Sequence, residues 1–392
     1  MSNIPASLSR RATLRGLGAL AATFTLSMRR AQAQAATSII GDSSQLSDLG
    51  MPLSDEQRAA GVAFLRRHPS VDLHCHPGRF FLSNLPYQTA TTRAFGEPFE
   101  QQALADLNAG NVSGALFSAV ADMRLLEMTP TGGMHAGQDF KPGEAYADYQ
   151  RQIALLKTLL RDPQLAKGLS PGDVDAAHRG HKTAAVFAVE GGDFIEDKLD
   201  RVHEALRDGV RSVTIVHYHV NQIGDIQTES PVHHGLTPLG KSIVREMNRA
   251  GIIIDLAHAT FDVAKGVLAA SSKPVMISHT NLLTATVNHP RLISTEHAKM
   301  VAAAGGVIGS WPSAVGQATF ADYIDSIRRL VDAVGIDHVG IGTDMDANYK
   351  PVLRSYRDWS LVPAVLLAKG MSETEVARVM GGNFQRLFAA NS

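Results

Sequence analysis

Short, nearly continuous apolar runs recur along the chain from residue 70 onward, and stretches with helical amphipathic periodicity separate them. Such runs are typical of parallel strands whose sheet is covered on both faces. The pattern predicts eight strands, at residues 70–76, 112–120, 183–190, 212–217, 252–258, 274–279, 306–311 and 339–344. It predicts helices at residues 54–67, 145–160, 197–207, 240–249, 261–270, 295–304, 321–334 and 373–380.

Eight parallel strands that alternate with helices are enough to close into a barrel. The sequence therefore predicts an α/β protein with a single (β/α)₈ TIM-type barrel over residues 54–392. Residues 80–101 and 123–143 are expected to form loops beside the barrel mouth, and no repeat or second domain is indicated.

The first 35 residues have a different composition. Arg10 and Arg11 precede an apolar stretch at 17–28, and small residues at 31–35 offer cleavage sites. This pattern predicts a twin-arginine-type signal peptide over residues 1–35, with a linker or arm at 36–53. We expect export by the twin-arginine machinery to the periplasm or the medium. The apolar stretch is too short for a stable transmembrane anchor.

The overall charge excludes one class of partner. The chain has 37 basic and 38 acidic residues, so its net charge of -1 gives no electrostatic support for nucleic-acid binding. Cys75 is the only cysteine, which excludes an intramolecular disulfide.

Titratable residues stand at the end of most predicted strands. The carboxyl ends of barrel strands face one mouth, where active sites are built, so we expect these side chains to converge. Each histidine alone could instead be a core residue bonded to the backbone, but their shared location favours a site. The residues are His74, His76, Glu190, His217, His258, His279 and Asp344.

The triplet at residues 74–76 indicates what the site holds. Alternation in a strand places His74 and His76 on one face, whereas Cys75 points away and is expected to be a buried, inert thiol. Imidazole is a preferred zinc ligand. Several imidazoles and a carboxylate exceed the needs of one zinc ion and suit two ions about 3.5–4 Å apart with a bridging hydroxide. The expected chemistry is hydrolysis of an amide or ester.

Motifs along most of the mature chain match one family. The chain resembles the membrane dipeptidase (renal dipeptidase-like) family of zinc peptidases, in the amidohydrolase superfamily. The matching stretches include 186–192, 235–241, 246–251, 254–258, 274–279, 288–291, 335–344 and 381–384.

The resemblance implies a role for each matching residue. His74 and His76 would hold the first of two Zn²⁺ ions, or another divalent metal, and His258 and His279 the second. Glu190 would bridge both ions. His217 would stabilise the oxyanion, Arg291 would pair with the carboxylate of a dipeptide, and Asp344 would be the acid/base group. The resemblance also leaves a homodimer open.

This chain departs from the family pattern at one ligand. His76 stands where the family usually has an aspartate, so the first metal site has one negative charge fewer. Asp72 is expected on the same strand face, where it could compensate. Two other functions stay open on the same residues. One is hydrolysis of a lactam, lactone or N-acyl amino acid, and the other is a non-catalytic metal-binding barrel.

Overall fold

The structure is a computed structural model that describes residues 47–129 and 133–392. The predicted signal peptide and most of the predicted arm therefore lie outside the described residues. No helix in the described ranges is long and apolar enough to cross a membrane.

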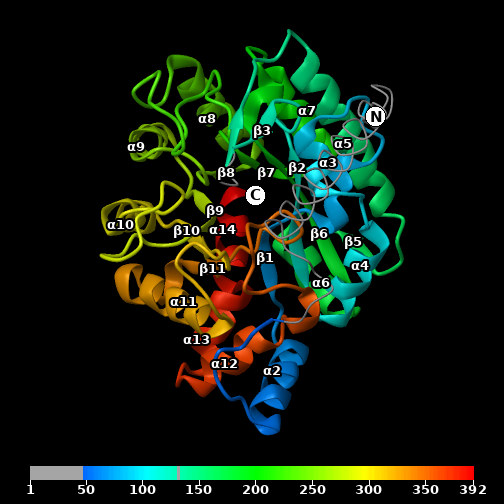
Figure 1. The fold of residues 1–392 in the computed structure, drawn as a ribbon, viewed down its shortest axis with the longest axis vertical. Coiled ribbons are helices and arrows are strands. Elements are labelled where there is room, and N and C mark those ends of the chain that lie inside the picture. The colour runs from blue at the N-terminus through cyan, green and yellow to red at the C-terminus, as the bar shows by residue number, and fades with distance from the viewer. Residues whose placement is uncertain (1–46, 130–132) are drawn as a thin grey trace, which may run out of the picture.

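Eight parallel strands form a closed barrel, as predicted (Figure 1). Their order around the barrel is β2-β1-β11-β10-β9-β8-β7-β6, and pairing of β2 with β6 closes the ring. The strands are β1 (Val71–Cys75), β2 (Gly114–Val120), β6 (Thr183–Glu190), β7 (Val210–Thr214), β8 (Ile253–Asp255), β9 (Met276–Thr280), β10 (Val307–Ser310) and β11 (Val339–Ile341).

Helices surround the barrel, and the eight predicted ones are present. Four further helices, at residues 100–109, 171–179, 361–368 and 383–391, were not predicted. Many begin at a polar cap, such as Ser54 before α2 and Thr319 before α11, because a side-chain oxygen satisfies a free backbone amide there. The helices are α2 (Asp55–Arg67), α4 (Glu100–Ala109), α5 (Glu144–Leu159), α6 (Pro171–Arg179), α7 (Asp200–Asp208), α8 (Pro238–Ala250), α9 (Phe261–Ala270), α10 (Thr295–Ala303), α11 (Phe320–Val334), α12 (Leu361–Ala368), α13 (Glu373–Ala377) and α14 (Asn383–Asn391).

Two segments predicted as loops are more ordered than expected. The segment at 80–101 begins within the short helix η1 (Pro77–Leu82) and contains α3 (Ala90–Phe95), which Thr89 caps. The segment at 123–143 contains an antiparallel hairpin of β3 (Leu126–Met128) and β4 (Met134–Ala136). A further short strand, β5 (Leu165–Lys167), pairs with the first half of β6. These elements are too short for their periodicity to be recognised in the sequence.

The barrel interior is closed at the amino ends of the strands by α14. Phe384, Leu387 and Phe388 of this helix pack with inward residues of the strands, such as Val186 and Met276. A second, larger apolar cluster fills the space between the barrel and the outer helices. The carboxyl ends of the strands are therefore the open end of the barrel.

An irregularity in β1 sets the direction of the predicted ligands. The pairing of β1 with β2 shifts register between Asp72 and Cys75. As a result two consecutive side chains point inward. Leu73 packs in the apolar cluster inside the barrel, and His74 reaches Glu190 at the barrel mouth. The expectation that Asp72 lies on the ligand face of the strand is wrong, and Asp72 belongs to neither metal-ligand group. Its carboxylate accepts hydrogen bonds from the Tyr356 hydroxyl and from the backbone amides of Thr343 and His74.

Candidate metal centre and catalytic site

Five predicted ligands converge at the mouth in two groups that share one carboxylate. The first group is His74, His76 and Glu190, and the second is Glu190, His258 and His279. In each group the ligand atoms lie within 4.8 Å of one another, and all five residues are buried.

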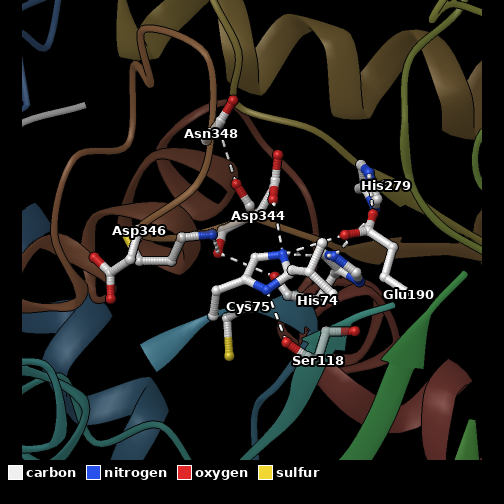
Figure 2. A network of polar contacts seen from close by, with 12 residues as sticks. His74, Cys75, Ser118, Glu190, His279, Asp344, Asp346 and Asn348 are labelled. Atoms are coloured by element: carbon white, nitrogen blue, oxygen red, sulfur yellow. Dashed lines mark hydrogen bonds and ion pairs between the residues drawn. The ribbon is translucent and has the colours of Figure 1, made fainter. Parts of the chain in front are cut away.

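Glu190, at the end of β6, stands between the groups. Its Oε1 lies 3.3 Å from His74 Nε2 and 3.1 Å from His258 Nε2, and its Oε2 lies 3.4 Å from His76 Nε2. His279 Nε2 is 3.7 Å from Oε1. Figure 2 shows the Glu190 carboxylate beside His279, with the Cys75 thiol pointing away from it.

Hydrogen bonds at Nδ1 hold the imidazole rings of two predicted ligands in place. His76 Nδ1 lies 2.8 Å from the Ser118 carbonyl oxygen and therefore donates to it, which leaves the lone pair on Nε2. His279 Nδ1 contacts the Ser278 hydroxyl at 2.9 Å. The Nε2 atoms of both imidazoles point toward the Glu190 carboxylate, where a metal ion would meet them.

The electrostatics of the five residues suit a cation. Burial lowers the pKa of His258 and His279 well below the usual value, so both imidazoles are neutral at pH 7. Burial would raise the pKa of Glu190, but the charges of His217 and His74 outweigh it and lower the pKa well below the usual range. A carboxylate between four imidazoles fits two divalent cations of the zinc type.

His76 has a strongly acidic neighbourhood. Burial would lower its pKa, but the hydrogen bonds and charges of Asp344 and Glu190 outweigh burial and raise it to about 10. Asp344 Oδ1 lies 3.4 Å from His76 Nε2. The carboxylates that attract a proton to His76 would equally attract a cation.

Cys75 is not part of either group. Its thiol donates to the Leu116 carbonyl at 3.4 Å, and burial raises its pKa well above the usual value. A buried thiol of raised pKa is unreactive.

His217 is held by a carboxylate that the sequence analysis missed. Asp122 Oδ1 lies 2.6 Å from His217 Nδ1, and its Oδ2 accepts the Tyr218 amide at 3.0 Å. His217 Nε2 then faces Glu190 Oε2 at 3.4 Å. Asp122 follows β2 by two residues, so the rule that titratable residues follow strand ends could have found it.

Arg291 lies against the second ligand group. Its Nη2 is 3.0 Å from both His258 Nε2 and His279 Nε2, and its Nη1 donates to Gln227 Oε1 at 2.6 Å. The guanidinium also faces the Trp311 ring at 5.6 Å. The structure thus places this cation directly beside the predicted ligands.

Two site residues have unusual backbone angles. His258 and Asp344 have φ values of 66° and 54°, in the left-handed region that few residues other than glycine adopt. Such strain persists where the surrounding structure enforces it, and it concentrates at functional sites. Asp344 donates its amide to the His74 carbonyl at 2.8 Å, which fixes β11 against β1 at this point.

A cavity of about 610 Å³ opens above these residues. Its volume is in the range of pockets that bind small molecules. Titratable site residues line one part of it: His76, Glu190, His217, His258, His279, Arg291 and Asp344.

The barrel and the shared-carboxylate site define a metal-dependent hydrolase. A match over residues 56–391 to the family described as Membrane dipeptidase (Peptidase family M19) shows that the chain belongs to this family. The family resemblance seen in the sequence is therefore confirmed.

Individual relatives agree with this membership. The chain is similar to Dipeptidase verJ of Clonostachys rogersoniana, with 29% identity over 86% of this chain and 88% of the relative. Two solved structures share the fold. The probable dipeptidase PvdM from Pseudomonas aeruginosa has a TM-score of 0.69 at 21% identity, covering 86% of this chain and 98% of that one. A Rhodobacter sphaeroides metallo peptidase, liganded with a phosphinate mimic of L-Ala-D-Ala, has a TM-score of 0.67 at 18% identity, covering 83% and 99%.

Proposed function

We propose that the chain is a zinc dipeptidase with two zinc ions, and that it hydrolyses the peptide bond of free dipeptides. His74 and His76 would hold one ion, His258 and His279 the other, and Glu190 both. The observation that carries this proposal is the Glu190 carboxylate, whose two oxygens contact imidazoles of both groups. Family membership supports the dipeptidase activity.

The ions, when bound, would supply a water activated for attack at neutral pH and would polarise the peptide carbonyl. The protein would supply the remaining groups. His217 lies beside Glu190, where its Nε2 can donate a hydrogen bond to the oxygen that develops negative charge. Asp344, with a side chain 14% exposed at the cavity, can pass a proton to the departing amine.

Arg291 would recognise the free carboxylate of the substrate. The proposal assigns the Nε2 lone pairs of His258 and His279 to zinc, which leaves the guanidinium to form paired hydrogen bonds with a carboxylate. The position of Arg291 in the cavity lining, beside the second ligand group, supports this role.

A substrate panel tests the proposal. The zinc-loaded protein should hydrolyse L-Leu-L-Ala at least about 10²-fold more efficiently than the C-terminal amide of the same dipeptide, because the amide leaves Arg291 unpaired. Arg291→Met should narrow this ratio by reducing activity on the free dipeptide. Equal hydrolysis of the amide would refute the role of Arg291. Hydrolysis of a lactone, lactam or N-acyl amino acid in place of every dipeptide would assign the site to another amidohydrolase activity.

A further inference from the structure

Two buried aspartates near the carboxyl ends of the strands have no part in the chemistry proposed above. Asp72 lies in β1, two residues before His74, and Asp255 ends β8, three residues before His258. Their exposed fractions are 0% and 1%, and neither belongs to a metal-ligand group. A buried carboxylate is costly unless hydrogen bonds satisfy it, so its partners indicate what it does.

Asp255 joins the ends of β8 and β9. The two strands pair in register at Asp255 and Met276. Two residues beyond this pair on each strand, Asp255 Oδ1 accepts the backbone amides of Ala257 at 3.0 Å and Ser278 at 2.8 Å. Each of these amides belongs to the residue directly before a histidine of the second ligand group. One carboxylate oxygen therefore holds the backbone that carries both histidines.

Asp72 repeats this arrangement between β1 and β11. These strands pair at Asp72 and Ile341. Two residues further along each strand, Asp72 Oδ1 accepts the backbone amides of His74 at 3.1 Å and Thr343 at 2.9 Å. His74 is itself a predicted ligand of the first group, and Thr343 directly precedes the predicted acid/base residue. The same bonding pattern thus occurs once beside each ligand group.

The strained backbone of the site follows the amides that these carboxylates hold. His258, with a φ of 66°, comes directly after Ala257, and Asp344, with a φ of 54°, comes directly after Thr343. A left-handed conformation at such residues persists only where the surrounding bonds enforce it. The two aspartates supply these bonds at the point where the strands reach the site.

We propose that Asp72 and Asp255 are positioning residues, each of which sets the affinity of one metal site. Asp72 would act on the first ion through His74, and Asp255 on the second ion through His258 and His279. The proposal rests on the two-ion site of the proposed function. Because the carboxylates bond to backbone amides, the feature that matters is the acceptor oxygen and not the negative charge.

Zinc content per chain, measured in the full chain against a competing chelator, tests this assignment. In Asp72→Ser and Asp255→Ser the shorter hydroxyl can accept the amide two residues on, but it does not reach the neighbouring strand. Each variant should keep one tightly held ion and bind the other about 10- to 100-fold more weakly.

Combination with His76→Ala identifies the ion that each variant loses. Asp72→Ser in this background should still hold one ion, because both changes weaken the same site. Asp255→Ser in this background should hold none. Loss of both ions in either single Ser variant, or two tightly held ions in both, would overturn the proposal while leaving the two-ion site intact. Fewer than two ions in wild type would overturn the two-ion site as well.

Asn variants separate the acceptor oxygen from the charge, and they decide the matter if a Ser variant does not fold. In Asp72→Asn and Asp255→Asn the carboxamide oxygen can accept the same two amides, and the hydroxyls now bonded to Oδ2 can turn to accept from the new amide group. Both variants should hold two ions. Loss of an ion in either would assign the effect to charge and overturn the proposal.

Tyr356→Phe is the matched control for Asp72. It removes the hydroxyl that donates to Asp72 Oδ2 at 2.6 Å and leaves both amide bonds on Oδ1 in place. This variant should therefore hold two zinc ions, even if its free energy of unfolding falls. Loss of the first ion in Tyr356→Phe would show that the amide bonds on Oδ1 do not set the affinity.

Discussion

The orientation of His217 depends on one buried carboxylate. Asp122 is fully buried and uses one oxygen for His217 Nδ1 and the other for the Tyr218 amide. A histidine that donates from Nδ1 to a carboxylate keeps its ring fixed, with Nε2 toward the substrate side. Asp122 is therefore a positioning residue, which acts through His217.

A double-mutant cycle tests this dependence. Asp122→Asn should lower kcat for Leu-Ala by about 10²-fold, similar to the loss of an oxyanion donor, because the amide can no longer hold the imidazole in the required tautomer. In a His217→Ala background the same change should have little further effect. Zinc content should stay at the wild-type value in all variants. Independent, additive losses would show that Asp122 does not act through His217.

The individual ligands could be predicted from the sequence because they follow apolar runs at strand ends. The direction of His74 and His76 came from strand alternation, and the structure agrees. Alternation failed for Asp72, because the register shift in β1 turns two consecutive residues, Leu73 and His74, toward the barrel axis. A bulge of this kind depends on the neighbouring strand and has no signature in the strand itself.

At the scale of elements, His219 connects three segments beside the mouth. Its Nδ1 lies 2.6 Å from Asp193 Oδ1 in the short helix after β6, and its Nε2 lies 3.3 Å from Asp139 Oδ1 in the segment between β4 and α5. Burial would lower the pKa of His219, but the hydrogen bond and charge of Asp193, with those of Asp122 and Asp139, raise it to about 9.

This contact predicts a pH-dependent contribution to stability. Folding raises the pKa of His219, so protonated His219 adds to the free energy of unfolding. This contribution is complete below about pH 6.5 and is lost as pH rises through about 9. The difference in unfolding free energy between wild type and His219→Gln should thus be larger at pH 6 than at pH 9.5 in denaturant titrations. His234→Gln, at an exposed histidine, is the control and should differ little from wild type at either pH. A His219→Gln difference that is constant with pH would contradict the prediction.

The elements that the sequence missed are short and form through tertiary contacts. The β3–β4 hairpin and α3 were predicted as loops, yet both contribute residues to the cavity lining. The backbone hydrogen bonds of the hairpin join two separate segments, as where Met128 pairs with Met134. Neither segment is long enough to show a periodic pattern of its own. This part of the cavity lining could therefore not be predicted from the sequence, whereas the convergence of the ligand set could.

For the molecule as a whole, the barrel could be predicted because its buried strands leave continuous apolar runs. The closing contact of β2 with β6 is the part that required the structure, since 62 residues separate Val120 from Thr183 and β3, β4 and β5 intervene. The closed ring brings β1, β6, β8 and β9 to one mouth, so ligands distant in sequence share one site (Figure 1).

Export is the prediction for the whole molecule that rests on sequence alone. Replacement of both Arg10 and Arg11 by Lys should retain the precursor in the cytoplasm of a bacterium with a twin-arginine pathway, while wild type is processed and reaches the periplasm. Cell fractionation and the mass of the amino terminus measure this. Equal export of both proteins would refute a twin-arginine signal.

In the function we propose, two metal ions held by His74, His76, Glu190, His258 and His279 carry out dipeptide hydrolysis. The most direct test is the zinc content per chain, measured by elemental analysis together with Leu-Ala hydrolysis, in wild type and His76→Ala. We expect two zinc ions per wild-type chain, loss of activity with a chelator and its return with zinc. His76→Ala should lose tight binding of one ion together with most of the activity. Two tightly held ions in His76→Ala, or full activity in metal-free protein, would contradict the account.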